Sequence, residues 1–404
     1  MPGKPTHRPH CIFCSSPYHD YRRCPLAFKL IALRKITAKQ EYTAQSPNIF
    51  VGTHGYPRVN VGFLNVEQYT EHDEPLKWSR ENRQIPHIVG LRASLINSTY
   101  NQHIKRFSER LTAMAQEVSM AKRPADIELS LKKKPSFRTT FTQDAQPHGP
   151  NVPLVRARFT SNVATDQRVE RVVDDTDLKA ASGIATLYKR GVDEHRLTRL
   201  LSIGNLGVRA QRKLVPTRWS ITAVDDTVGK QLIAHLKRFP EGNCTVHTGG
   251  YLGNEYVIML FDDVWSYELF EGYLPRLKAI GNEAWETDYE PYEGRKSYAE
   301  ETAGGYYAAR LAILEALARR RRQAAVLALR FVTQEYSVPL GVWVVREAVR
   351  KAMQSAPRTF PDRAHMLRFV LDYCRQYFVD CRGVLAKSKL LRKLKSQTKL
   401  NQWV

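Results

Sequence analysis

Residues 46–62 read Ser-Pro-Asn-Ile-Phe-Val-Gly-Thr-His-Gly-Tyr-Pro-Arg-Val-Asn-Val-Gly, and we start from this stretch because it indicates a β structure. Two short runs of strand-forming residues flank the turn His-Gly-Tyr-Pro, which predicts a hairpin. Residues 58–61 alternate polar and apolar side chains, so one face of that strand is expected to be buried. A glycine-rich hairpin that bears His54, Tyr56 and Arg58 fits the lining of a phosphate or nucleotide site. The plainer interpretation is a tight hairpin with exposed polar residues.

A second informative stretch, residues 215–230, reads Val-Pro-Thr-Arg-Trp-Ser-Ile-Thr-Ala-Val-Asp-Asp-Thr-Val-Gly-Lys. Its first part alternates polar and apolar side chains, which predicts a half-buried strand over residues 218–223. A helix is expected to follow from about residue 228.

Two adjacent acids, Asp225 and Asp226, would then lie where this strand gives way to the helix. Carboxylates at that point suit a divalent cation, and Arg218 and Lys230 would approach the same place. The alternative is that one acid caps the helix while the other complements its dipole. The residues alone leave both interpretations open.

Further strands are expected along the chain, with helices between them. Residues 243–248 and 255–261 predict a hairpin, and the nearly all-apolar run that follows Glu255 predicts a central strand. The fold class is therefore α+β, with a mixed, largely antiparallel sheet packed with helices. We expect a zinc module in residues 1–28, a main domain in residues 29–382, and an extended basic tether in residues 383–404.

The composition is strongly basic. The 404 residues carry a formal net charge of +22, so the protein is attracted to polyanions, with nucleic acid as the first candidate. No apolar run approaches the ~20 residues that span a bilayer, and no apolar segment typical of a signal peptide follows the N-terminus. We expect a soluble, cytoplasmic protein that does not enter a membrane.

A cysteine cluster lies near the N-terminus. Cys11, Cys14, His19 and Cys24 have the spacing Cys-x2-Cys-x4-His-x4-Cys, which supplies three thiolates and one imidazole for a closed tetrahedral Zn²⁺ site. The spacing equals that of zinc knuckles, which often bind single-stranded nucleic acid. The glycines typical of a knuckle are absent, so a structural zinc staple is the alternative.

The C-terminus ends on apolar side chains at a spacing of three. Gln397, Leu400 and Trp403 fall on one face of a 3₁₀ turn, and Val404 follows them. The pattern resembles the clamp-binding motif, or PIP motif, with which proteins dock on the sliding clamp (PCNA type) that tethers enzymes to DNA. Val404 occupies the position of a second aromatic residue. The alternative is a helix end that folds back on the core.

Taken together, these motifs resemble the archaeal Nre family of DNA repair proteins. The resemblance rests on residues 48–52 and 55–59 of the hairpin, on residues 215–226 and on the clamp-type terminus, and it covers nearly the whole chain. It implies handling of DNA damage at the sliding clamp. The clamp-binding role falls on the four terminal residues named above, and the resemblance assigns no catalytic residue.

Three functions remain open at this point. The first is a repair factor, recruited to the clamp, that holds damaged or single-stranded DNA. The second is an enzyme acting on a nucleotide or on DNA, with a site of Arg58, Arg218, Asp225, Asp226 and Glu255, a second divalent cation, and a ligand near His54, Tyr56 and Lys230. The third is a zinc-bearing RNA-binding protein. Whether the protein is an enzyme is left open by the residues.

Overall fold

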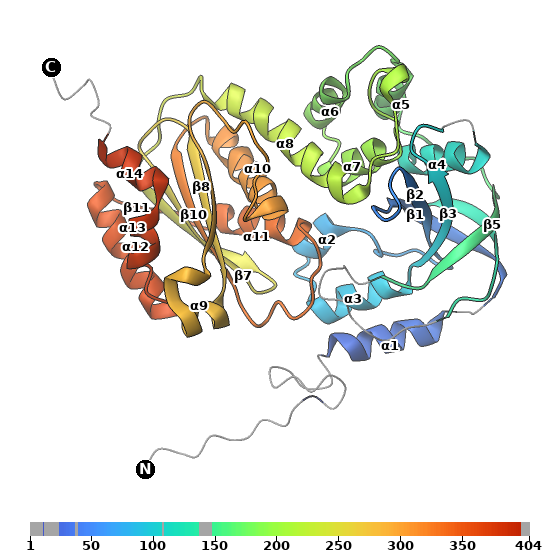
Figure 1. The fold of residues 1–404 in the computed structure, drawn as a ribbon, viewed down its shortest axis with the longest axis horizontal. Coiled ribbons are helices and arrows are strands. Elements are labelled where there is room, and N and C mark those ends of the chain that lie inside the picture. The colour runs from blue at the N-terminus through green and yellow to red at the C-terminus, as the bar shows by residue number, and fades with distance from the viewer. Residues whose placement is uncertain (1–10, 12–23, 37–38, 107–108, 137–147, 397–404) are drawn as a thin grey trace. The chain divides into compact units, whose positions relative to one another are not determined.

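The computed structural model describes residue 11 and residues 24–36, 39–106, 109–136 and 148–396. The chain divides into two compact units (Figure 1). Unit 1 comprises Met1–Val228 with Val338–Leu340, and unit 2 comprises Gly229–Ser337 with Gly341–Val404. Both units combine helices with a β structure, which confirms the α+β class.

Unit 1 is built on a closed five-stranded barrel with the strand order β1-β2-β3-β5-β4. The strands are β1 (Glu41–Val51), β2 (Arg58–Val66), β3 (Ile96–His103), β4 (Ala125–Leu131) and β5 (Asn151–Phe159). All neighbouring pairs are antiparallel except β3 with β5, which is parallel. The predicted hairpin of residues 46–62 is thus confirmed as β1 and β2.

The barrel interior is filled by the apolar side chains that alternate along its strands. In β2, Val59, Val61 and Phe63 are fully buried, whereas Arg58 and Asn60 point outward. Helix α4 (Arg110–Met120) connects β3 to β4 and adds Met114 and other side chains to the same core.

Unit 1 contains further helices. They are α1 (Pro25–Lys35), α2 (Pro75–Arg80), α3 (Ile85–Ser94), α5 (Gln167–Asp174), α6 (Ala180–Lys189), α7 (Glu194–Ser202) and the short 3₁₀ helix η2 (Arg209–Gln211). Helix α8 (Thr217–Leu236) begins in unit 1 and continues beyond Val228 into unit 2. Helix α7 contacts β1 of the barrel, α6 packs next to α5 and α7, and α1 packs on α3. The Asp193 side chain caps α7 by accepting a hydrogen bond from the Arg196 backbone N–H.

The strand expected over residues 218–223 is wrong, because these residues begin helix α8. The buried side chains of Ser220, Val224, Asp225 and Val228 are spaced by about four residues, which is a helical period. Asp225 and Asp226 therefore lie within a helix. The geometric reason for expecting a cation at the end of a strand no longer applies to them.

Unit 2 contains a six-stranded sheet with the order β11-β6-β7-β10-β8-β9. The strands are β6 (Thr245–Tyr251), β7 (Asn254–Phe261), β8 (Ser266–Tyr273), β9 (Glu286–Glu290), β10 (Ala325–Val332) and β11 (Arg358–Thr359). Only β10 with β8 is parallel. The expected β6–β7 hairpin is confirmed, and β7 is an interior strand as predicted.

Helices cover both faces of this sheet (Figure 1). Helices α10 (Ala303–Arg320) and α11 (Trp343–Gln354) lie on one face, and α12 (Arg363–Tyr377), α13 (Arg382–Lys387) and α14 (Lys389–Ser396) lie on the other. Helix α9 (Leu274–Ile280) and the 3₁₀ helix η3 (Gly281–Ala284) connect β8 to β9. Among the described residues, no helix is long and apolar enough to cross a membrane.

The basic segment expected to be an extended tether forms the two helices α13 and α14 over most of residues 382–396. Val384, Leu390 and Leu391 are buried in the core of unit 2. The buried carboxylate of Glu268 accepts hydrogen bonds from the Ser388 hydroxyl and from two backbone N–H groups at the start of α14. Apolar burial and this cap fasten the segment to the sheet, so the tether prediction is wrong for these residues.

Unit 2 also encloses charged groups. Arg310 and Glu290 form an ion pair in which each side chain is only 1% exposed, and Trp265 donates a further hydrogen bond to Glu290. His247 is fully buried, donates from Nδ1 to the Ser355 carbonyl and accepts at Nε2 from Arg320 (2.8 Å). Burial, together with the arginine charge, lowers the pKa of His247 to about 4, because a protonated ring would face another donor.

Candidate nucleic-acid interface

The topology of unit 1 points to a particular face of the barrel. A five-stranded barrel with a β1-β2-β3 meander, a parallel β3–β5 pair and a helix between β3 and β4 has the arrangement of oligonucleotide/oligosaccharide-binding barrels. Such barrels bind their ligands on the face of strands 2 and 3, with help from the loops that follow strands 1 and 4. The outward side chains of β2 and β3 are therefore the candidate ligand-binding surface.

The outward side chains of β2 and β3 form a polar surface, which we call the barrel face. Its members are Arg58 and Asn60 on β2, opposite His103 and Asn101 on β3. The Asn101 side-chain amide donates to the Asn60 amide oxygen over 3.3 Å, so the two neighbouring amides are held in a fixed relation. The face offers donors and acceptors suited to phosphates, sugars and base edges.

The loop between β1 and β2, residues 52–57, borders this face. Gly55 has a φ of +81°, and a Cβ there would lie 2.7 Å from the Arg58 carbonyl oxygen, so the turn requires glycine. The Arg58 backbone N–H closes the turn on the Gly55 carbonyl over 2.9 Å. His54 and Tyr56 are thereby held exposed at the tip, with 43% of Tyr56 accessible.

The start of helix α8 lies beside the same loop. The Val51 backbone N–H, at the end of β1, donates to the Thr217 hydroxyl over 2.9 Å. Two residues along, the ring centroid of Trp219 lies 5.2 Å from that of Tyr56, with 54° between the planes. We call Tyr56 and Trp219 the aromatic pair. Trp219 is 49% exposed, so the pair borders the barrel face without being covered by it.

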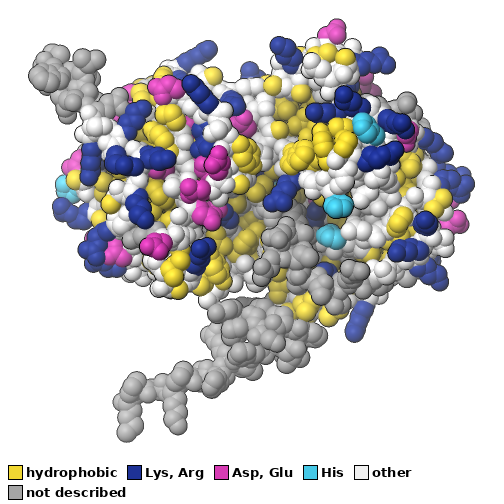
Figure 2. Space-filling view, in the orientation of Figure 1, with side chains coloured by type: hydrophobic (Ala, Val, Ile, Leu, Met, Phe, Trp, Pro, Cys, Tyr) yellow, Lys and Arg dark blue, Asp and Glu magenta, His cyan; other side chains and the backbone are white. Residues whose placement is uncertain are grey.

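Cations surround the aromatic pair and the end of β3. The Ile104 backbone N–H bonds the Pro57 carbonyl, and the Leu214 N–H bonds the Ile104 carbonyl, so the flanking segments meet there. Five exposed cations on these segments form no ion pair with any described residue, and we call them the cation cluster: Arg58, Lys105, Arg106, Lys213 and Arg218. Figure 2 shows Lys and Arg side chains on the surface of both units in the face in view.

Acidic residues are absent from the sequence around this face. No Asp or Glu occurs in residues 42–66 or in residues 82–108, which contain β2, β3 and the loop between β1 and β2. The barrel's acids lie elsewhere, for example at Glu128 on β4, where Arg158 pairs with it. The segments that form the barrel face thus carry cations and no acids, a balance that favours a polyanion.

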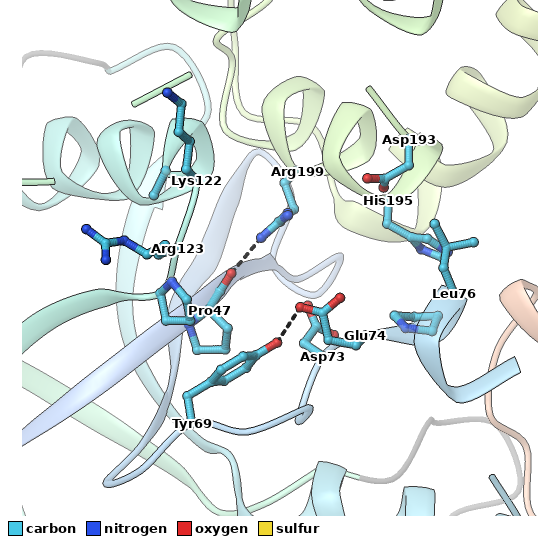
Figure 3. A pocket seen from close by; sticks show the side chains of 13 residues that line it. Pro47, Tyr69, Asp73, Glu74, Leu76, Lys122, Arg123, Asp193, His195 and Arg199 are labelled. Carbon is cyan, nitrogen blue, oxygen red and sulfur yellow. Dashed lines mark hydrogen bonds between the residues drawn. The ribbon is translucent and has the colours of Figure 1, made fainter. Parts of the chain in front are cut away.

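A cavity of about 100 Å³ lies elsewhere in unit 1 (Figure 3). Two hydrogen bonds join residues that line it. The Tyr69 hydroxyl donates to Glu74 over 2.8 Å, and Arg199 donates to the Pro47 carbonyl over 2.6 Å. In Figure 3, Lys122 extends away from the Tyr69–Glu74 pair. Burial and the neighbouring carboxylate raise the pKa of Tyr69, so its proton stays on the hydroxyl as the donor of that bond. We place the nucleic-acid interface on the barrel face and not in this cavity.

The structure brings together part of the residue set suggested by the sequence. His54, Tyr56 and Arg58 lie in or beside one loop, and the aromatic pair joins that loop to the helix turn that carries Arg218. Their predicted role near a nucleic acid or nucleotide remains a prediction that this grouping favours.

The suggested acids are arranged differently. Asp225 is 1% exposed inside helix α8, whereas Lys230 and Glu255 belong to unit 2. Burial and the nearby Glu335 raise the pKa of Glu255. Across the described part of the chain, no group of three or more His, Cys, Asp or Glu side chains has an arrangement that would hold a metal ion. The cation suggested for Asp225 and Asp226 thus gains no further ligand there.

Two sets of predicted residues fall largely outside the described part of the chain. The residues outside it are Cys14, His19 and the terminal residues Gln397, Leu400, Trp403 and Val404. Of the zinc ligands, Cys11 and Cys24 are described, and both are buried next to Ala27. The zinc and clamp predictions therefore remain predictions.

Sequence reasoning missed Asn101, His103, Lys105 and Arg106. Residues 96–103 were not predicted as a strand, although they contain the β-branched and aromatic side chains of Ile96, Thr99 and Tyr100. The absence of any acid across residues 82–108 was a further signal that this segment faces a polyanion.

Comparison with known proteins identifies the family. The family model described as "Archaeal Nre, N-terminal" matches residues 19–277, and the one described as "Archaeal Nre, C-terminal" matches residues 290–403. No solved structure matches the chain.

The chain is also similar to individual proteins over most of their length. The chain is 34% identical to "DNA repair protein NreA" of Haloferax volcanii over 361 residues, which is 84% of each chain. It is also 34% identical to "DNA repair protein NreB" of Archaeoglobus fulgidus over 403 residues, covering 96% of this chain and 98% of the relative. A third relative, "DNA repair protein NreA" of Archaeoglobus fulgidus, is 34% identical over 84% of this chain. The chain therefore belongs to the archaeal Nre family.

Proposed function

We propose that this protein acts in DNA repair and holds DNA on the barrel face of unit 1. Its relatives are named DNA repair proteins, which supplies the process. The single observation that carries the proposal is the barrel itself: its β2–β3 face is polar, free of acids and bordered by the cation cluster. A face of that kind attracts the phosphates of a nucleic acid at any sequence.

The chemistry of each side chain indicates which part of the DNA it would contact. The cation cluster would contact phosphates, which fixes the strand on the protein without reading its sequence. The paired amides of Asn60 and Asn101, which can donate and accept, would contact sugars or base edges. Each phosphate contact releases a counterion from the nucleic acid, so the affinity should fall as the salt concentration rises.

A binding measurement with matched variants tests this placement. Arg58→Gln/Lys105→Gln removes two exposed cations beside the barrel face, and Arg276→Gln/Lys278→Gln removes two exposed cations of helix α9 in unit 2. At about 100 mM salt, the first variant should bind labelled single-stranded DNA about 10-fold or more weakly, because two phosphate contacts are lost. The second should bind like the wild type. Equal losses in both variants would contradict the placement.

The same assay separates the DNA and RNA interpretations. Single-stranded DNA, duplex DNA and RNA of one sequence are compared at several salt concentrations, because affinities at a single salt concentration mislead. A clear preference for RNA would favour the zinc-bearing RNA-binding alternative over DNA repair.

Recruitment to the sliding clamp belongs to the same proposal and is supported by the sequence pattern of Gln397, Leu400, Trp403 and Val404. An aliphatic and an aromatic anchor at this spacing fit two neighbouring pockets. Deleting residues 397–404 should abolish co-elution with the clamp while leaving the unfolding temperature and DNA binding unchanged. Co-elution of the truncated protein with the clamp at moderate salt would contradict this role.

Zinc binding is proposed for Cys11, Cys14, His19 and Cys24. Its support is the ligand spacing, together with the burial of Cys11 and Cys24. One zinc ion per chain is expected in the purified protein. It should be lost in Cys11→Ser/Cys24→Ser and kept in Cys244→Ser, which changes a buried cysteine of unit 2. A wild-type protein without zinc, prepared in zinc-containing medium, would refute the assignment.

A further inference from the structure

Three aromatic side chains of unit 1 stand out because they are exposed. Among the described residues of unit 1, the exposed aromatic side chains are those of Phe50, Tyr56 and Trp219. All three belong to one region, since Phe50 lies near the end of β1, Tyr56 lies in the following loop, and Trp219 lies in the helix turn that Thr217 joins to Val51. Scattered exposed apolar residues are ordinary, but a group at one place indicates a binding surface.

The geometry of the aromatic pair leaves room for another ring. With centroids 5.2 Å apart and planes inclined by 54°, Tyr56 and Trp219 touch without stacking face to face. Because about half of each side chain remains accessible, each ring keeps area that a third flat group can cover. A ring placed on the indole face of Trp219 would at the same time meet the Tyr56 ring.

The charges around the aromatic pair indicate which kind of flat ligand binds there. The cation cluster flanks the pair, and no acid occurs in residues 42–66. An apolar peptide gains nothing from unpaired cations, whereas a nucleotide carries a flat base and a phosphate one sugar away. Aromatic platforms beside a positive groove are the usual means of holding single-stranded nucleic acid.

We infer that Tyr56 and Trp219 form a stacking site for an unpaired nucleobase, so that the protein selects DNA with unpaired bases over intact duplex. The inference rests on the proposed binding of DNA at the barrel face, and it adds a side chain, Trp219, that the barrel does not supply. In a duplex, both faces of each base are covered by its neighbours. A base must be unpaired or unstacked before it reaches the pair.

The site is held in place before a ligand arrives. Gly55 closes the loop that carries Tyr56, and the hydrogen bond from Val51 to Thr217 fixes the helix turn that carries Trp219. Holding both rings in position lowers the entropy lost on binding. The two ends of the site come from segments more than 160 residues apart in sequence, joined by a bond with a separation of 166 residues.

The test compares three ligands of equal length, about 12 nucleotides, within the range that one such barrel occupies. They are a single-stranded thymidine oligonucleotide, the same strand with every base removed, and a blunt duplex. Trp219→Ala and Tyr56→Ala are compared with Tyr273→Ala, which removes a 47% exposed aromatic of unit 2. Circular dichroism and thermal unfolding confirm that each full-length variant is folded.

Removing one stacking ring should weaken binding of the normal strand by about 5- to 100-fold. The abasic strand, which keeps the phosphates, should bind wild type and Trp219→Ala equally, and Tyr273→Ala should bind all ligands like the wild type. Trp219 is the exposed tryptophan among those described, so the normal strand should also quench the protein's fluorescence. That quenching should disappear in Trp219→Phe, which retains an aromatic ring and most of the affinity.

Each contrary outcome has a distinct meaning. If Trp219→Ala binds the normal strand as tightly as the wild type while Arg58→Gln/Lys105→Gln does not, the stacking site is wrong and DNA binding at the barrel face stands. Equal weakening on normal and abasic strands would also overturn stacking, because the contact would be with the backbone. If neither variant changes the affinity, the proposed barrel interface fails as well.

Discussion

Replacing Arg58 and Lys105 with glutamine should change the salt dependence of DNA binding by a calculable amount. Both side chains are exposed, lie beside the barrel face and have no acidic partner among the described residues. Each cation that contacts a phosphate releases a condensed counterion from the nucleic acid. The logarithm of the binding constant therefore falls linearly with the logarithm of salt concentration.

The structure sets the magnitude. If the five members of the cation cluster each contact one phosphate of a single strand, the slope is about −3.5, from about −0.7 for each contact. Between about 50 and about 200 mM salt, the wild type would then lose affinity about 100-fold. The double variant keeps three contacts, so its slope should be about −2.1 and its loss about 20-fold.

Fluorescence anisotropy of a labelled thymidine oligonucleotide, titrated at several salt concentrations, measures both slopes. Arg276→Gln/Lys278→Gln is the matched control, because it removes the same charge from helix α9. The control slope should equal that of the wild type. An unchanged slope in Arg58→Gln/Lys105→Gln, or an equal change in the control, would refute the reasoning, since the phosphates would then be contacted elsewhere.

Three further predictions concern stability. Arg310→Met leaves the 1% exposed carboxylate of Glu290 without its ion partner and should cost about 3–5 kcal/mol in urea unfolding; a cost below about 1 kcal/mol would contradict the buried pair. Because His247 has a folded-state pKa of about 4 against an ordinary 6.5, its contribution to stability is complete above pH 6.5 and falls by up to about 3 kcal/mol as the pH drops toward 4. The unfolding free energy of His247→Gln should lack this part of the pH dependence. Thr217→Val leaves the Val51 N–H without its acceptor and should cost about 1–3 kcal/mol in the same assay, whereas Thr217→Ser should match the wild type.

The local parts of the fold were predictable because their signals are local. The hairpin of residues 46–62 follows from alternation around a glycine-containing turn, and β7 follows from its apolar run. The loop residues His54, Tyr56 and Arg58 were found because the turn exposes polar side chains at a recognisable place. These signals need only a few consecutive residues.

The barrel was not predictable in the same way. Its closure depends on β1 pairing with β4 and on β3 pairing in parallel with β5, both across long stretches of sequence. The sequence within a strand does not determine which other strand it pairs with. Consequently the barrel face could not be assembled from the sequence, although Arg58 was named and the composition pointed to a polyanion.

Helix α8 shows how a short pattern misleads. Six alternating residues from 218 to 223 fit a strand, but over the full length from Thr217 to Leu236 the burial follows a helical period. Because these residues are helical, Asp225 lies on a buried helix face and not at the end of a strand. In the same helix, Trp219 lies next to Tyr56. The prediction of an extended tether failed for a related reason. The many charged residues of 382–396 outweighed Val384, Leu390 and Leu391, which pack on the sheet.

Photo-crosslinking of the full-length protein to a halogenated single-stranded oligonucleotide, followed by peptide mapping, tests the central claim most directly. The claim is that the outer face of β2 and β3, with the aromatic pair beside it, holds the strand. We predict crosslinks at Tyr56 and Trp219 and in the peptides that carry Arg58 and His103. Crosslinks confined to peptides of unit 2, with none in residues 52–66, 96–106 or 213–219, would contradict it.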